Sequence, residues 1–215
     1  MKPQVSPNHY FCKKYNTAER LACFDIQAGL IIGLRPKNAL EIGIGNGKVA
    51  KRVRKTGILV TTLDFDKKLK PDIVAETTNL PLEKNSFDLV SCFEVLEHLP
   101  YKEFETSLGE IHRVARKYTL LSLPDVSRQY SLVVPAFKNL IKKFIGLSEK
   151  TETHIFDGQH YWEIGKTEYP LEKILKDIKK NDFLIKKTFI HKTCPNRRFF
   201  ILKCLKSKKY TQGVV

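Results

Sequence analysis

The segment Ala39-Leu-Glu-Ile-Gly-Ile-Gly-Asn-Gly47 decides the fold, because a hydrophobic strand is expected to turn into a helix there. Its alternating glycines, Gly43, Gly45 and Gly47, allow backbone conformations closed to other residues and let the chain approach a ligand closely. Glu41 adds a fixed carboxylate beside the turn. The segment therefore predicts a nucleotide-binding turn.

The spacing of these glycines argues against a dinucleotide ligand. A dinucleotide fingerprint reads G-x-G-x-x-G, and its last glycine packs the helix against the strand. Here the pattern is G-x-G-x-G, Lys48 stands where that last glycine would be, and the acidic residue comes before the loop. A cationic, amine-bearing ligand fits this turn better than a diphosphate.

The run ALEIGIGNGKVA resembles motif I of the class I S-adenosylmethionine (SAM)-dependent methyltransferases, in particular the methyltransferase type 11 group. Three further segments, in the same order as in that family, extend the resemblance from about Asn38 to Pro124. A strand-like segment ends in Asp64, where the family has an acidic side chain that accepts both ribose hydroxyls. Glu76, four residues before Leu80-Pro81, matches the adenine-side acidic residue, although Asp is more usual there.

The fourth segment is Leu89 to Phe93 followed by Glu94-Val-Leu-Glu-His98, which resembles the part of the family that borders the methyl donor. The resemblance implies SAM as the cofactor. It also implies a cofactor site made of Glu41, Gly43, Gly45, Gly47, Asp64, Phe65, Glu76, Thr77 and Phe93. Taken singly, a glycine-rich turn can be only a tight turn, and Asp64 or Glu76 could be a surface carboxylate.

Strand and helix patterns alternate along the chain, which predicts a parallel sheet with helices on both faces. We expect strands at 39–43, 58–63, 73–75, 88–93 and 118–123, with helices at 46–55 and 101–116. Helix 169–180 and two β-rich runs, 182–191 and 198–205, would close the fold. With the resemblance, this is an α/β, Rossmann-like, seven-stranded, mostly parallel sheet with an antiparallel C-terminal strand.

At 215 residues the chain is long enough for one domain, and we expect residues 1–215 to form it. Residues 1–36 would be an N-terminal helical cap, in which His9 to Tyr15 could cover the donor. Residues 124–168 exceed a simple crossover and are expected to be an insertion that shapes the acceptor site. In it, Pro135 opens a basic amphipathic segment, and the segment around Trp162 suggests a binding surface rather than core.

The candidate catalytic residues lie after the strands, where open α/β sheets bind ligands. His98 is the first choice as general base, because a neutral imidazole accepts protons near pH 7. Glu97 and His160 are the other catalytic candidates, and Glu94, Asp125 and Tyr161 could also reach the site. For His98, capping the strand-to-helix loop is an equally good interpretation.

Glu94-x-x-Glu97-His98 with a later His160 also resembles the metal-ligand pattern of small-RNA 3′-terminal 2′-O-methyltransferases and, for E-x-x-E-H, that of ubiquinone-pathway O-methyltransferases. Two carboxylates and an imidazole could hold Mg²⁺ or a similar ion that activates a hydroxyl. Many similar methyltransferases carry such a segment without metal. We therefore name no metal ligand and keep the metal site as an alternative.

Lys and Arg outnumber Asp and Glu by 38 to 23, which gives a formal charge of +15. Such an excess could attract RNA or an anionic membrane, but the lysines are spread along the chain, so solvated faces are the favoured interpretation.

The five cysteines form no C-x-x-C pair. Cys23, Cys92 and Cys204 are expected to be small core residues, in a soluble cytoplasmic protein without a leader or membrane span.

These features favour a SAM-dependent methyltransferase acting on a hydroxyl or amine of a small-molecule or glycan acceptor. One alternative is an RNA 2′-O-methyltransferase, with or without a divalent metal. Another is a non-catalytic SAM-binding scaffold, which the intact Glu41, glycines and Asp64 argue against. Peripheral membrane contact is possible but not favoured.

Overall fold

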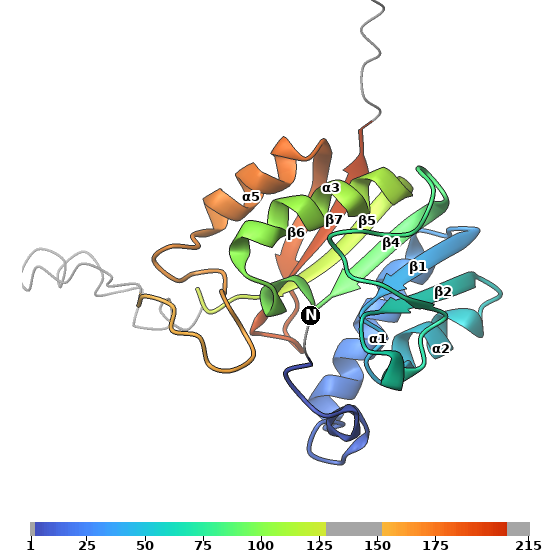
Figure 1. Cartoon of the computed structure of the whole chain (residues 1–215), viewed down its shortest axis with the longest axis horizontal. Coiled ribbons are helices and arrows are strands. Elements are labelled where there is room, and N and C mark those ends of the chain that lie inside the picture. Colours follow the sequence, from blue (N-terminus) through green and yellow to red (C-terminus); the bar gives the residue numbers. More distant parts are fainter. Residues whose placement is uncertain (1–2, 128–151, 206–215) are drawn as a thin grey trace, which may run out of the picture.

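The computed structural model describes residues 3–127 and 152–205, whose strands form one seven-stranded sheet in the order β3-β2-β1-β4-β5-β7-β6 (Figure 1). Strands β1 to β5 are parallel to one another, and β7 is antiparallel to both β5 and β6. The expected fold class is confirmed. The strands are β1 Asn38–Ile42, β2 Leu59–Asp64, β3 Ile73–Val74, β4 Phe87–Phe93, β5 Ala115–Pro124, β6 Phe183–Ile190 and β7 Arg197–Cys204.

Helices cover both faces of the sheet, so the apolar residues of the central strands are buried on both sides. One layer of the core lies under α1 (Ala18–Gly33) and α2 (Lys48–Arg54), and the other lies under α3 (Phe104–Val114) and α5 (Leu171–Lys180). Short 3-10 turns are η1 Pro7–Phe11, η2 Lys67–Leu69, η3 Leu96–His98 and η4 Tyr101–Glu103. No helix in 3–127 or 152–205 is both long and apolar enough to cross a membrane.

The element boundaries differ from the expected ones where local geometry intervenes. The helix expected at 46–55 begins only at Lys48, because Gly47 takes a left-handed conformation as its N-cap. The helix expected at 101–116 starts with a 3-10 turn and ends at Val114. From Ala115 the chain is already extended and pairs with β4, so no connecting loop separates α3 from β5.

Trp162 is a core residue, so the expectation that it forms part of a binding surface is wrong. Its side chain is fully buried, with ring centroids 5.0 Å from those of Tyr101 and Phe104, and its Nε1 donates to the carbonyl of Leu99 at 3.2 Å. The indole therefore anchors the loop that carries His160 onto the sheet domain. The amphipathic segment expected after Pro135, with Lys142 and Lys143, lies outside the described residues, as does the tail from 206.

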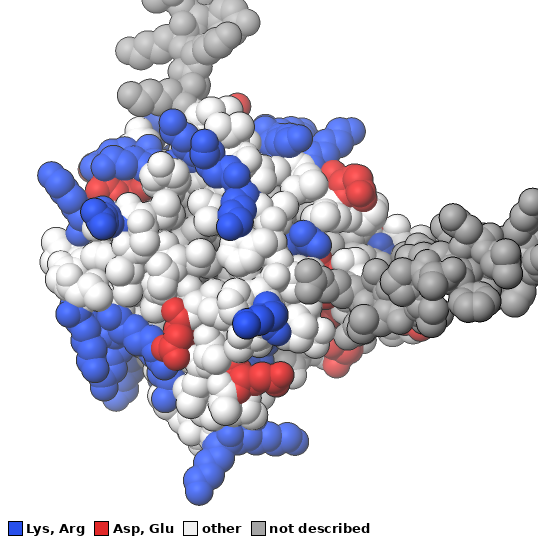
Figure 2. All heavy atoms as spheres, turned by 180° about the vertical axis from the view of Figure 1, so that it is seen from behind, with Lys and Arg blue, Asp and Glu red and all other residues white. Residues whose placement is uncertain are grey.

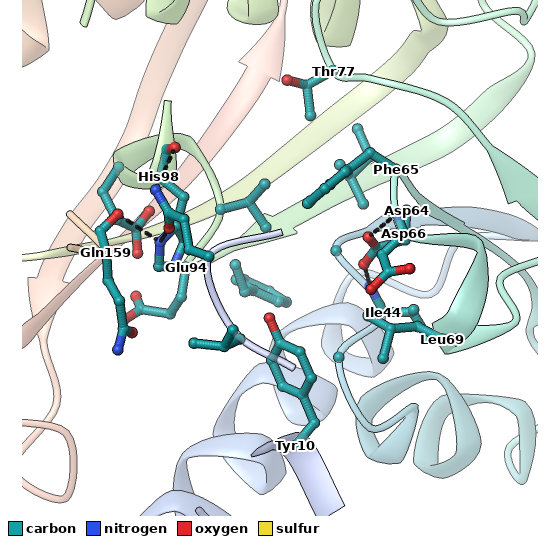
Figure 3. A pocket seen from close by; sticks show the side chains of 18 of the residues that line it. Tyr10, Ile44, Asp64, Phe65, Asp66, Leu69, Thr77, Glu94, His98 and Gln159 are labelled. Atoms are coloured by element: carbon teal, nitrogen blue, oxygen red, sulfur yellow. Dashed lines mark hydrogen bonds between the residues drawn. The ribbon is translucent and has the colours of Figure 1, made fainter. Parts of the chain in front are cut away.

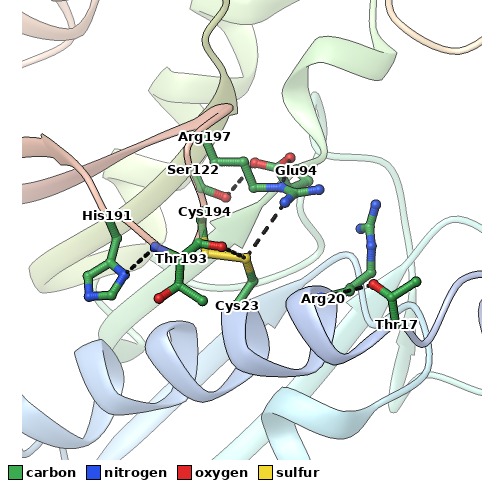
Figure 4. The surroundings of a disulfide bond; sticks show 9 residues. All are labelled: Thr17, Arg20, Cys23, Glu94, Ser122, His191, Thr193, Cys194 and Arg197. Carbon is green, nitrogen blue, oxygen red and sulfur yellow. Dashed lines mark hydrogen bonds and ion pairs between the residues drawn. A yellow bond between two sulfur atoms is a disulfide. The ribbon is translucent and has the colours of Figure 1, made fainter. Parts of the chain in front are cut away.

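A disulfide joins Cys23 of α1 to Cys194 in the turn between β6 and β7 (Figure 4). Cys23 is a buried core residue, as expected, but its bond to Cys194 was not expected. The two Cα atoms are 6.0 Å apart although 171 positions separate the residues. α1 lies across the sheet beside that turn, a proximity that cysteine spacing cannot reveal. Cys92 is buried and unbonded, as expected, and Cys204 is only half-buried.

We expect loss of this disulfide to lower the stability of the fold. Because the bond closes a loop of 171 residues, chain entropy alone gives up to roughly 5 kcal/mol. Cys194→Ser should lower the urea midpoint strongly, whereas Cys12→Ser, at an exposed free cysteine, should leave it unchanged. Urea unfolding with and without a dithiol reductant measures this effect. An unchanged wild-type midpoint after full reduction would contradict it.

Candidate active site

A cavity of about 520 Å³ opens at the C-terminal ends of β1, β2 and β4, and its volume suits a small-molecule ligand. Open α/β sheets bind ligands at this edge. Figure 3 shows Asp64, Asp66 and Ile44 on one side of the cavity and His98, Glu94 and Gln159 on the other. The structure thus places the nucleotide-turn residues and the candidate bases around one space.

The glycine turn follows β1 directly and forms one wall of the cavity. Gly43 has a φ of +82°, and a Cβ there would lie 2.3 Å from Cγ2 of Val95, so no larger residue fits. Gly45 faces the ring of Tyr10. Gly47, expected in the ligand site, serves as the N-cap of α2, and the cavity is lined instead by its neighbours Gly45 and Asn46.

Asp64, the last residue of β2, ties that strand to the glycine turn. Its Oδ2 accepts the backbone N–H of Ile44 at 3.0 Å, and its Oδ1 accepts that of Asp66, also at 3.0 Å. Burial raises the pKa of Asp64, against the opposing effect of these hydrogen bonds. The carboxylate is therefore held in a fixed orientation at the cavity wall.

Glu41, in β1, is buried with only 4% of its surface exposed, although it lines the cavity. Its Oε2 has no hydrogen-bond partner among the described residues. Burial raises the pKa of Glu41 to about 8. An amine or another donor brought by a ligand would satisfy this oxygen, which agrees with the cationic ligand expected from the sequence.

We expect Glu41→Gln to change how stability depends on pH. The pKa of Glu41 is about 8 in the folded protein against an ordinary 4.5, so the wild type loses stability as pH rises between these values. The free energy of unfolding falls by at most about 5 kcal/mol over this range, and Glu41→Gln, whose side chain is neutral, should not show this fall. Urea unfolding at about pH 5 and about pH 8 measures the difference, with exposed Glu83→Gln as control. Parallel pH profiles for wild type and Glu41→Gln would contradict the prediction.

The other residues expected in the cofactor site, among them Glu76 for the adenine, follow the ends of β2 and β3 or end β4. Phe65, Glu76, Thr77 and Phe93 all line the cavity. Thr77 is buried, and its hydroxyl is 3.0 Å from that of Ser107. Two aromatic rings, a carboxylate and a hydroxyl thus line the same cavity, a combination that suits a heteroaromatic ligand.

On the opposite side, the turn η3 presents Glu97 and His98. Glu97 is fully buried, and neither carboxylate oxygen has a hydrogen-bond partner in the described part of the chain. Burial, and then the charge of Glu94, raise the pKa of Glu97 well above its ordinary value. Burial, and then the nearby His160, lower the pKa of His98, so its imidazole is neutral at pH 7.

His160 lies beside His98, with ring centroids 5.1 Å apart. Its Nδ1 is 2.7 Å from Oε1 of Glu163. Although burial works against the cation, the hydrogen bond and charge of Glu163 raise the pKa of His160. The two histidines therefore differ in charge preference: His98 favours the neutral form and His160 the protonated one.

Two other candidate bases are engaged elsewhere. Glu94 accepts the hydroxyl of Ser122 at 2.8 Å and pairs with Arg197 at 2.6 Å. Asp125 is fully buried outside the cavity lining, where Arg198 pairs with it. Both oxygens of each carboxylate are thus engaged by protein partners, so neither side chain is well placed to act as a general base.

The sequence did not reveal several residues that line the cavity. Gln4, Tyr10, Gln159 and Arg197 all contribute to it, from three separate segments, since Gln4 and Tyr10 both belong to residues 3–16. Burial raises the pKa of Tyr10 to about 12, so its phenol stays protonated. Tyr10 lies in the stretch His9 to Tyr15, which the sequence suggested as a cover for the donor, whereas Gln4, Gln159 and Arg197 belong to no motif.

The positive charge does not concentrate in the cavity. Among the described residues that line it are two arginines, against seven carboxylic side chains: Glu41, Asp64, Asp66, Glu76, Glu94, Glu97 and Glu103. On the face seen in Figure 2, Lys and Arg form several separate groups interrupted by Asp and Glu. This distribution agrees with the interpretation of most lysines as solvated surface.

A Rossmann-like sheet with a glycine turn, a carboxylate at the end of the next strand and a ligand-sized cavity defines a nucleotide-binding α/β domain. Residues 40–123 match the model of a methyltransferase domain family. These residues contain all four sequence motifs. This match agrees with the resemblance seen in the sequence to the SAM-dependent methyltransferases, a class whose methyl donor is SAM.

Similar proteins agree at the level of the fold. Magnesium protoporphyrin IX methyltransferase from Synechocystis PCC 6803, solved with bound S-adenosylhomocysteine, superposes with a TM-score of 0.59 at 19% identity, covering 87% of this chain and 84% of that one. A protein from Pyrococcus horikoshii OT3 gives a TM-score of 0.65 at 12% identity, covering 94% and 100%.

A curated relative is similar over a shorter stretch. The ubiquinone biosynthesis O-methyltransferase of Vibrio atlanticus (strain LGP32) is 32% identical over 83 residues, which cover 32% of this chain. The match spans about a third of that relative's length, 35%.

Proposed function

We propose that the protein transfers a methyl group from SAM to a hydroxyl of a small-molecule or glycan acceptor, with an amine as the alternative acceptor group. The observation that carries this proposal is the position of His98, whose imidazole lines the same cavity as the glycine turn and Asp64 and whose pKa is lowered by burial. A hydroxyl needs a base when it attacks a sulfonium methyl, whereas an amine needs one less. The name of the curated relative, an O-methyltransferase, supports a hydroxyl.

In this proposal the donor lies along the glycine turn, with its ribose hydroxyls on Asp64 and its adenine against Phe65, Glu76, Thr77 and Phe93. Glu41 and the backbone at Gly43 and Gly45 hold the amino-acid end. Both oxygens of Asp64 already accept backbone N–H groups, so the carboxylate is oriented before the donor arrives. Such preorganisation reduces the ordering cost of binding.

On the acceptor side, His98 accepts the proton of the acceptor's hydroxyl group. The oxygen of that hydroxyl attacks the methyl carbon of SAM in line with the leaving sulfur. Positioning and removal of water supply the rest of the rate. Glu97 is fully buried and adds a polar group beside His98 at the cavity wall. His160, favoured as a cation, stabilises negative charge that develops on the acceptor oxygen.

We further propose that residues 1–215 act as one domain, with 1–36 as a cap over the donor and 124–168 shaping the acceptor site. In the described part of 124–168, Gln159, His160 and Tyr161 line the cavity. Trp162, directly after them, is anchored in the core. The loop can therefore present its polar groups from a fixed position.

An RNA acceptor and a non-catalytic scaffold are the other functions to separate by experiment. The seven carboxylic groups around the cavity disfavour a polyanion there. Incubation with labelled SAM and pools of phenols, sugars, amines and RNA, followed by mass spectrometry, tests all three. Methylated RNA with steeply salt-dependent binding would replace the small-molecule proposal. Calorimetry without SAM or S-adenosylhomocysteine binding would reject both enzyme functions.

One observation favours a metal-assisted version of the reaction. Ligand atoms of Glu97, His98 and His160 lie within 4.8 Å of one another. Neither oxygen of Glu97 has a hydrogen-bond partner within residues 3–127 and 152–205, and the Nδ1 atoms of both histidines face oxygen acceptors. Histidines that bind metals are commonly oriented in this way by their second nitrogen. These residues fit a divalent cation, which when bound would lower the pKa of the acceptor hydroxyl.

A second group, Asp157, His160 and Glu163, is better explained without an ion. Asp157 accepts the backbone N–H groups of Gln159 and His160, at 2.8 and 2.7 Å, and Glu163 pairs with the His160 ring. These hydrogen bonds explain why the three side chains lie together: they stabilise the conformation of the loop.

The metal version is tested by titrating chelator-treated protein with Mg²⁺ or Mn²⁺ in a calorimeter. We expect binding in the wild type, loss of binding in Glu97→Gln, and no loss in Glu103→Gln, whose carboxylate lies outside the three-residue group. Absence of heat in the wild type, with methylation unaffected by chelator, would remove the metal and leave His98 as the base.

A further inference from the structure

The N-terminal segment 3–16 is attached to both sides of the cavity. On the acceptor side, Gln4 bonds to His98. On the donor side, Nδ2 of Asn46, within the glycine turn, donates to the Tyr10 carbonyl at 3.3 Å and to Oδ1 of Asn16 at 2.9 Å. The segment therefore connects the two halves of the site, and Figure 3 shows Tyr10 between them.

The contact of Gln4 with His98 has two complementary hydrogen bonds. Nε2 of Gln4 donates to the backbone carbonyl of His98 at 3.3 Å, and Oε1 of Gln4 is 2.8 Å from the Nδ1 of its ring. Because the amide nitrogen faces a carbonyl, which only accepts, the amide oxygen must face Nδ1. The side chain of Gln4 therefore contacts both the backbone and the ring of His98.

The same contacts determine the tautomer of His98. The backbone carbonyl of Gln159 lies 3.0 Å from Nδ1 and can only accept. With acceptors from Gln4 and Gln159 on it, Nδ1 must carry the proton, and the lone pair of the neutral ring then lies on Nε2. A base that accepts through Nε2 needs this tautomer and this ring orientation.

We propose that Gln4 is a positioning residue, which fixes the ring of His98 when the segment 3–16 closes over the cavity. This inference rests on the proposed function and adds how the acceptor side is completed. One movement of the segment then has two effects. It covers the donor through Asn16 and Asn46, and it aligns the base His98 through Gln4. The segment allows turnover only when the donor side is covered.

Matched variants at the two ends of the segment test the proposal. Gln4→Met keeps the length of the side chain but removes both hydrogen bonds, and we expect kcat to fall about tenfold with Kd for SAM nearly unchanged. Asn16→Ala should do the reverse, weakening SAM binding while kcat at saturating SAM is retained. Lys14→Met, at an exposed lysine of the same segment, should change neither. In a His98→Ala background, Gln4→Met should have no further effect on kcat.

A measurement independent of turnover uses the ring signals of His98. In nitrogen-15 spectra the wild type should show the Nδ1–H tautomer, with exchange of that proton against water at least about tenfold slower than in Gln4→Met. Equal exchange rates, or equal kcat in Gln4→Met and wild type, would overturn the proposal. A wild type without methyl transfer would refute the proposed function instead, and the exchange rates would still decide the role of Gln4.

Discussion

Asp64→Ala is expected to weaken SAM binding by at least ~100-fold, since a charged acceptor contributes about 1.5–3 kcal/mol to each hydrogen bond and the ribose would lose two. The same substitution releases the backbone N–H groups of Ile44 and Asp66, which Asp64 now accepts. The glycine turn would lose its link to β2. Both effects act on the donor, so SAM and S-adenosylhomocysteine should lose affinity to a similar extent.

Isothermal calorimetry with both ligands measures this change. Asp25→Ala is the matched control, because Asp25 is an exposed carboxylate that pairs with Arg52 outside the cavity. Circular dichroism and the urea midpoint show whether Asp64→Ala remains folded. If the folded variant binds SAM within about threefold of wild type, the ribose lies elsewhere and the donor orientation proposed here is wrong.

The relative placement of the glycine turn and Asp64 was predictable from sequence because they follow neighbouring parallel strands that are close in the chain. The strand, the turn and the carboxylate follow one another within the chain, and their geometry is dictated by local rules: β1 feeds the glycines, and the next parallel strand ends beside them. Glu41, Gly43 and Asp64 therefore line the same cavity, as the sequence pattern indicated. The sequence pattern did not predict that Gly47 is the N-cap of α2, because this depends on the left-handed backbone conformation of Gly47.

The acceptor side was less predictable because its residues come from distant segments. Gln4 bonds to a residue 94 positions away, and Arg197 to one 103 positions away. Trp162 looked like a surface aromatic in a polar loop, but tertiary packing against Tyr101 and Phe104 buries it. The Cys23–Cys194 disulfide has the same origin, since only the packing of α1 on the sheet brings its sulfurs together.

His98→Ala is expected to lower kcat by about 10²–10³-fold, the usual contribution of a general base. The Kd for SAM should stay within about threefold, because His98 lies across the cavity from Asp64 and Ile44. Rapid-quench measurement of a single turnover isolates the chemical step from product release.

The control is His112→Ala on α3, whose ring bonds to the Leu205 carbonyl and packs against Phe183 outside the cavity. Added imidazole should restore part of the rate in His98→Ala if the ring acts as a base, because the space left by the side chain opens into the cavity. If His98 instead orients a metal ion, imidazole should restore rate only when Mg²⁺ or Mn²⁺ is also present. Unchanged single-turnover kinetics in His98→Ala would exclude both roles and would leave Glu97 and His160 as the catalytic candidates.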